Sequence, residues 1–221
     1  MAPASTRTLP ATALVLASLT MAIVAAQACT ARTESAPAGT TTPAPETVAS
    51  GNAQAEWWES LRSLCGQAFA GALSHHDPAD EDLVGQRMVM HVRSCEGSTL
   101  AIPFHVGEDR SRTWVLSRSE AGIHLAHDHR HEDGSPDVVT LYGGSTTTEG
   151  TANEQQFPAD AYSRELFEAQ GLPQSATNVW SMEILPGERF SYTLRRTNRH
   201  FQVDFDLSQT VEPPPAPWGH D

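Results

Sequence analysis

The sequence predicts a mainly β protein, an antiparallel meander that closes into a barrel or forms a strongly curved sheet. Most of the chain after residue 85 alternates apolar and polar side chains with a period of two, which is typical of strands that bury one face. Turn residues interrupt this alternation at intervals of about 8 to 12 residues, so the connections are short. One helical pattern precedes the strands, and one short helix interrupts them. A sandwich of two sheets is the alternative architecture.

The first expected element is a helix over 55–65, which Gly66 ends. Its large side chains recur at helical spacing on one face, and they are Trp57, Trp58, Leu61, Leu64 and Cys65. An acidic loop over 75–85 then leads into the strands.

Five strands are expected next, over 86–95, 100–106, 113–117, 123–131 and 137–142. In the first, alternation places Met88 and Met90 on one face and Val89 and His91 on the other. In the second, the alternating apolar residues are Leu100, Ile102, Phe104 and Val106. Polar turns separate the strands, and Gly143 and Gly144 are expected to close the fifth.

A short helix is expected from its cap Asp160 to about Gln170, where Gly171 and Pro173 stop it. Three strands with clear alternation follow. Their apolar residues are Trp180, Met182 and Ile184, then Phe190, Tyr192 and Leu194, and finally Phe201, Val203, Phe205 and Leu207. This layout resembles calycin-type barrels, which implies that the amino-terminal helix plugs one end of the barrel.

The chain divides into four expected parts. These are a signal peptide over 1–28, a disordered Thr/Ala/Pro-rich tether over 29–55, a single β-rich domain over 56–212 and a Pro-rich tail over 213–221. One early positive charge, an apolar run and small residues before the cut indicate the signal peptide. A lasting membrane span is disfavoured, because polar residues break a run that would need roughly 20 apolar residues.

Cleavage after Ala28 would leave Cys29 at the new amino terminus. The pair Ala28-Cys29 resembles the end of a bacterial lipobox, with Ala26 where lipoboxes usually carry Leu. The resemblance implies a lipid on Cys29. Because Thr30 rather than Asp follows, it also implies an outer-membrane lipoprotein that faces the periplasm or the surface. A cleaved form that is soluble in the periplasm or secreted is the alternative.

Three cysteines in an exported chain leave one unpaired. Cys29 lies at the start of the tether, whereas Cys65 and Cys95 lie in patterned sequence. We therefore predict a disulfide between Cys65 and Cys95. Two separate buried thiols are the alternative.

The composition is strongly acidic, with 27 Asp and Glu residues against 14 basic ones and a formal net charge of -13. Binding to nucleic acid and adhesion to anionic lipid both need a positive surface, so the charge argues against both. Contact with a membrane is therefore expected only through an amino-terminal lipid.

A histidine-rich run over 124–133 is the densest polar cluster. In a strand, His127, His129 and His131 would share one face. Two imidazoles at i and i+2 could bind a zinc-like divalent metal with a third ligand, for which His91 and His105 are the candidates. A hairpin end with solvated histidines is the alternative.

Arginines near a turn offer a second possible site. The segment 109–112 holds Arg110 and Arg112, and it could grip an anionic ligand together with Arg93 and Arg118. Charge balance in so acidic a chain is the other explanation for these arginines.

No hydrolase elbow, phosphate loop or zinc-protease motif is present, which disfavours an enzyme and gives no catalytic residue. The body of the chain also resembles bacterial envelope proteins of no assigned activity, through the strings over 127–134 and 217–220. The leading hypothesis is an envelope protein that binds a small-molecule ligand or an envelope partner. The alternatives are a metal-dependent hydrolase or lyase that uses the histidines, and a structural lipoprotein with no small-molecule site.

Overall fold

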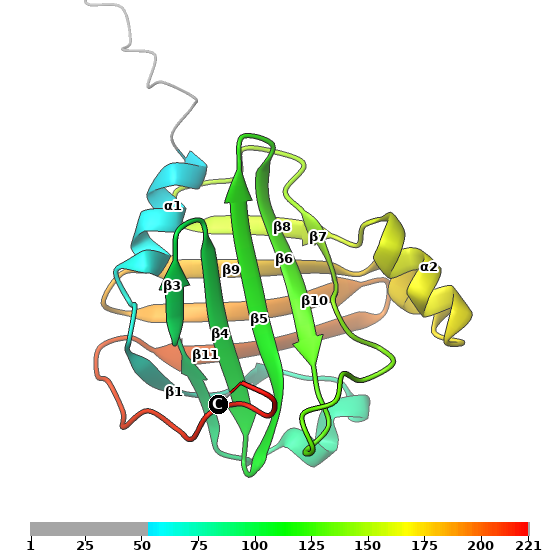
Figure 1. Cartoon of the computed structure of the whole chain (residues 1–221), viewed down its shortest axis with the longest axis horizontal. Coiled ribbons are helices and arrows are strands. Elements are labelled where there is room, and N and C mark those ends of the chain that lie inside the picture. The colour runs from blue at the N-terminus through cyan, green and yellow to red at the C-terminus, as the bar shows by residue number, and fades with distance from the viewer. Residues whose placement is uncertain (1–52, 221) are drawn as a thin grey trace, which may run out of the picture. The chain divides into compact units, whose positions relative to one another are not determined.

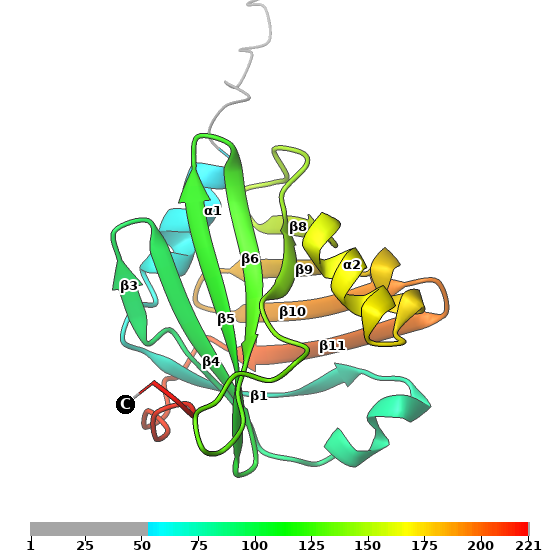
Figure 2. The same ribbon diagram turned by 45° about the vertical axis from the view of Figure 1, so that its right-hand side comes forward.

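Eleven antiparallel strands form one sheet that is nearly closed into a barrel in the computed structural model, which describes residues 53–220 (Figures 1 and 2). The predicted fold class is confirmed, and the arrangement is consistent with a calycin-like barrel rather than with a two-sheet sandwich. The expected signal peptide, the lipid-attachment residue Cys29 and the tether up to residue 52 lie outside the described residues.

The elements of the described part follow one another along the chain with short connections. They are α1 (Ala53–Arg62), β1 (Ala68–His75), η1 (Pro78–Leu83), β2 (Met88–His91), β3 (Ser94–Glu96), β4 (Thr99–Val106), β5 (Asp109–Ser119), β6 (Gly122–His129), β7 (Tyr142–Ser145), β8 (Glu154–Pro158), α2 (Ala161–Ala169), η2 (Pro173–Thr177), β9 (Val179–Leu185), β10 (Arg189–Arg196) and β11 (Arg199–Asp206).

The strand order around the sheet is β7-β6-β5-β4-β2-β1-β11-β10-β9-β8, and β3 pairs with β4 outside this path. The pairing of β1 with β11 brings the first strand beside the last, with Gly71 opposite Phe205. Leu194 of β10 lies opposite both Trp180 of β9 and Phe201 of β11. The apolar residues that alternate along these strands therefore face a common interior.

The seam between β7 and β8 is closed by the start of α2 instead of by a strand ladder. The hydroxyl of Ser163 accepts a hydrogen bond from the Gly143 N–H at 2.7 Å and donates one to the Gly143 carbonyl at 2.9 Å. The N–H of Asp160 donates to the same carbonyl at 3.0 Å. A Cβ on Gly144 would lie 1.9 Å from the Pro158 carbonyl oxygen, so only glycine allows the two strands to approach this closely.

Helix α1 covers one end of the barrel, at the top in Figure 2, and packs against β8 and β9. Its residues Trp57, Trp58 and Leu61 are buried, and the indole N–H of Trp57 donates to the Met182 carbonyl at 3.1 Å. The Gln54 side chain donates to the Thr146 hydroxyl, beside the start of β6. The helix therefore lies at the barrel end where β6 begins.

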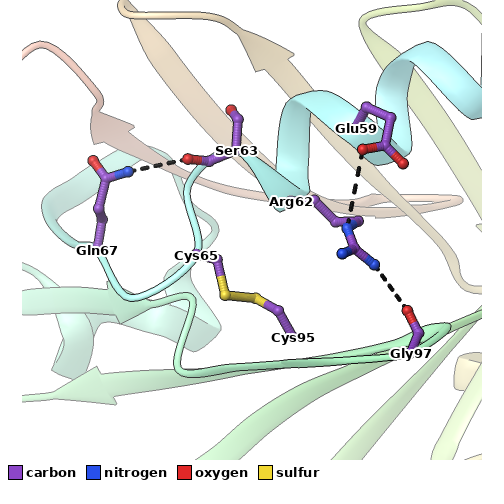
Figure 3. Close-up of a disulfide and its surroundings, with 7 residues drawn as sticks. All are labelled: Glu59, Arg62, Ser63, Cys65, Gln67, Cys95 and Gly97. Atoms are coloured by element: carbon purple, nitrogen blue, oxygen red, sulfur yellow. Dashed lines mark hydrogen bonds and ion pairs between the residues drawn. A yellow bond between two sulfur atoms is a disulfide. The ribbon is translucent and has the colours of Figure 1, made fainter.

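The predicted disulfide is confirmed. Cys65, just after α1, is bonded to Cys95 of β3, with their Cα atoms 6.3 Å apart (Figure 3). Arg62 of α1 donates to the Gly97 carbonyl in the turn that follows β3, at 2.8 Å. The helix is thus fixed to the β3–β4 hairpin by a covalent bond and by a hydrogen bond.

Two of the predicted strands differ in the structure. The single strand expected over 86–95 is two strands, β2 and β3, because the pairing with β4 is interrupted at Val92 and Arg93, where the register shifts by one residue. The prediction of a strand over 137–142 was wrong. Leu141 has a φ of 59°, and the strand at this place, β7, begins only at Tyr142. The glycines that were expected to end that strand lie inside β7.

Two strands, β1 and β8, and two short helices, η1 and η2, were not predicted. β1 is built mainly of small residues and β8 buries the polar Gln155, so neither shows a simple apolar alternation. The expected acidic loop over 75–85 contains η1, in which Asp80 is buried. The tail over 213–220 forms no strand and lies on the outer face, where Arg110 donates to the Ala216 carbonyl at 3.1 Å.

Candidate functional site

A cavity of about 420 Å³ opens at the barrel end opposite α1. Its mouth is bordered by η1, by η2, by the turn between β10 and β11 and by the loop over 137–141. Its walls come from the ends of β4 and β6 and from the starts of β5 and β9. The volume falls in the range of roughly 300 to 1,000 Å³ that is typical of small-molecule sites.

Aromatic rings form most of the inner wall. The indole of Trp114 stacks between Phe104 and Tyr192, with ring centroids 5.0 and 4.5 Å away. Tyr142 lies 5.7 Å from Trp180 and 5.2 Å from Phe167 of α2, centroid to centroid. These rings support one another, so the wall is a rigid apolar surface rather than a set of loose side chains.

His127 lies in this wall with both ring nitrogens engaged. Its Nδ1 is 3.0 Å from the Tyr142 carbonyl oxygen, which can only accept, so Nδ1 carries the proton and donates. Its Nε2 is then an acceptor, and the Tyr192 hydroxyl donates to it at 2.7 Å. Burial lowers the pKa of His127 to about 3, so the ring is neutral near neutral pH. Burial also raises the pKa of the Tyr192 phenol well above 10, which keeps it a donor.

His129 repeats this pairing one step nearer the mouth. Its Nε2 lies within hydrogen-bond distance of the Tyr142 hydroxyl, at 3.1 Å. Burial and, to a smaller extent, the positive charge of Arg112 lower the pKa of His129 to about 4. Burial raises the pKa of Tyr142 to about 12. The wall therefore offers polar atoms that can hydrogen-bond but carry no charge.

The charged groups gather at the mouth. Arg112 forms an ion pair with Asp109 at 2.5 Å. Arg199 is held by two carboxylates: it lies 3.1 Å from Asp77 and makes a two-pronged contact with the buried Asp80. The contact with Asp80 joins η1 to β11 and so fixes one side of the mouth.

The structure brings together only part of the predicted histidine site. His127 and His129 line the cavity, whereas His131 is exposed beyond the end of β6. His105 lies on the outer face of the wall, in a groove with Pro214 and Pro215 of the tail, and His91 is close to it. Among residues 53–220, no group of three or more His, Cys, Asp or Glu side chains is arranged to hold a metal ion.

The arginines of the 109–112 segment also separate. Arg112 lines the cavity, while Arg110 points to the tail and Arg93 contacts the His220 carbonyl. Sequence reasoning missed the contributions of Tyr142, Arg196 and Arg199. Arginines just before and after the β10–β11 turn were the available signal, but nothing in one sequence shows that this turn meets η1.

Comparison of the chain with protein-family models, with curated proteins and with solved structures finds no match. Within the described part of the chain, none of the helices combines the length and the hydropathy that crossing a membrane requires.

Proposed function

We propose that this chain is an exported envelope protein, lipid-anchored at Cys29, whose barrel binds a small and largely apolar ligand in the cavity opposite α1. The observation that carries the ligand proposal is the cavity itself: about 420 Å³ remain open inside a wall of stacked rings. Side chains that served only as core would fill such a space, because protein interiors are close-packed.

The polar groups of the wall support the same proposal. The wall carries His129 and Tyr142 as uncharged hydrogen-bonding groups, and neutral groups of this kind orient a ligand at little desolvation cost. At the other barrel end, the apolar residues Trp57, Trp58 and Leu61 of α1 are at most 2% exposed and pack into the core. The asymmetry between a packed end and an open end favours a binding role for the open one.

A neutral hydrophobic dye, phenylnaphthylamine, tests the cavity. We expect it to bind the purified protein, with an increase in its own emission and quenching of the emission of Trp114 and Trp180, which line the cavity. Native mass spectrometry of the protein purified from the envelope of the cells that produce it would show whether a ligand remains bound.

A matched pair of variants locates the dye. Ser175 of η2 lines the mouth, so Ser175→Trp places an indole in the entrance and should abolish binding. Gln174 is the exposed neighbour in the same turn, so Gln174→Trp should leave binding unchanged. Equal binding by both variants would place the dye elsewhere and contradict the proposal.

A further inference from the structure

The three arginines that line the cavity differ in what neutralises them. Arg112 is paired with Asp109, and Arg199 with Asp77 and Asp80. Arg196, the last residue of β10, instead donates to the uncharged Asn178 side-chain oxygen at 3.0 Å. Within residues 53–220, no carboxylate lies at ion-pair distance from Arg196.

The surroundings of Arg196 make this charge costly. The side chain is half-buried, and Arg199 carries a second positive charge nearby. Burial first, and then the charge of Arg199, lower the pKa of Arg196 below its usual value. A guanidinium has five N–H donors, and Asn178 accepts from only one nitrogen. Most of its donors therefore have no acceptor among the described residues, and the charge of Asp77, which is paired with Arg199, acts on Arg196 only from beyond ion-pair distance.

The other surfaces of the cavity restrict where a negative group could bind. His127 and His129 are neutral near neutral pH, so they supply no positive charge to the interior. The chain as a whole is strongly acidic, with a formal net charge of -13, so no long-range attraction would draw an anion to it. An anionic group would bind here only through local contact with the guanidinium.

We infer that the ligand is an amphipathic organic anion, with an apolar body against the stacked rings and one carboxylate or sulfonate group at the Arg196 guanidinium. This inference rests on the proposed function, because it assigns the chemistry of the ligand to the same cavity. Asn178 holds Arg196 in place from the side of η2, so the guanidinium is a preorganised partner for a planar anionic group.

Two dyes with the same ring system test the charge of the ligand. Anilinonaphthalene sulfonate carries one negative charge, and phenylnaphthylamine carries none. We expect Arg196→Gln to weaken binding of the sulfonate dye about tenfold or more, as loss of a hydrogen bond between charged groups does. Binding of the neutral dye should stay within about twofold of that of the unchanged protein.

Arg195→Gln is the matched control. Arg195 precedes Arg196 on β10 but lies on the outer face of the barrel with Thr193 and Gln202, so the substitution makes the same change in net charge without touching the cavity. We expect it to leave both dyes unaffected. Arg196→Lys keeps the charge and should retain part of the preference for the sulfonate dye. This variant provides the test if Arg196→Gln does not fold.

The outcomes separate the two proposals. Equal weakening of sulfonate-dye binding by Arg195→Gln and Arg196→Gln, or the same weakening of both dyes by Arg196→Gln, would overturn the assignment of an anion and leave the cavity as a neutral site. Failure of the unchanged protein to bind either dye would overturn the binding site itself.

Discussion

His127 and His129 are held neutral by the interior in which they lie, and this has a consequence for stability. Their pKa values in the folded protein are lowered to about 3 and about 4, against an ordinary value of 6.5. Above about pH 6.5 both the folded and the unfolded chain carry neutral rings. Below it the unfolded chain takes up protons that the folded chain does not, so stability falls as the pH falls.

The first prediction concerns this pH dependence. His129→Gln keeps an acceptor for the Tyr142 hydroxyl but removes the titrating ring. When the pH falls from about 7 to about 5, the free energy of unfolding of the variant should therefore decrease by about 1 to 2 kcal/mol less than that of the unchanged protein. Urea titrations at the two pH values measure it. The exposed His131 provides the control, and the idea fails if His131→Gln flattens the profile as much.

At the scale of elements, the seam between β7 and β8 depends on one hydroxyl. Ser163 of α2 is buried and satisfies both the N–H and the carbonyl of Gly143. No continuous ladder joins the two strands, because β7 and β8 are the two ends of the strand order. The start of α2 therefore takes the place of the missing strand pairing.

The second prediction is that Ser163→Ala lowers the free energy of unfolding by about 1 to 3 kcal/mol, because the Gly143 N–H is left buried without an acceptor. Hydrogen exchange should also become faster at β7 and β8 before it changes elsewhere. The exposed Ser145 of β7 offers a control, and Ser145→Ala should have little effect. If hydrogen exchange in Ser163→Ala changed equally throughout the barrel, the proposed role of the Ser163 hydroxyl between β7 and β8 would be contradicted.

The third prediction concerns the disulfide, which closes a segment with a sequence separation of 30. The double variant Cys65→Ala with Cys95→Ala should lose about 3 to 4 kcal/mol of unfolding free energy, because the unfolded chain regains the freedom of that loop. Chemical denaturation measures the loss. An intact mass that does not rise by two hydrogens on reduction would show that the bond is absent.

How well each element could be predicted depended on its surroundings. β4 and β9 to β11 bury large apolar residues on one face, so their alternation is visible in the sequence. β1 and β7 lie so close to neighbouring backbone or rings that glycine is required: a Cβ on Gly71 would lie 2.5 Å from the Phe205 ring, and one on Gly143 would lie 1.8 Å from the Leu125 carbonyl oxygen. Because glycine is required where β1 and β7 contact their neighbours, these strands lack the apolar alternation on which the prediction depended.

For the whole molecule, the candidate site was only partly predictable, because it is assembled from strands far apart in the chain. Trp114 lies opposite His127 in the β5–β6 pairing, which a hairpin makes predictable. The contact between His127 and Tyr192, by contrast, joins residues 65 positions apart across the barrel interior. Neither spacing nor composition reveals that contact, so the histidines were interpreted as possible metal ligands and not as part of a ring-lined wall.

The fourth prediction belongs to the complete chain. If export and lipid attachment occur as proposed, the mature protein begins at Cys29, and mass spectrometry of the membrane fraction should find a diacylglyceryl group on that residue. Cys29→Ser should release the protein from the membrane fraction without changing its binding of phenylnaphthylamine, since the cavity lies within residues 79–201. An unmodified Cys29 in purified native protein would exclude the anchor and indicate the soluble form.

The chain enters the barrel through α1, at the end where β6 begins, whereas the mouth lies where β6 finishes. Anything attached ahead of Ala53 therefore joins the molecule on the side remote from the entrance. Protein immobilised on a sensor surface through an amino-terminal tag should keep its entrance open to the solution, and small molecules could be screened by flowing them over it. Coupling through the β10–β11 turn would block the same entrance.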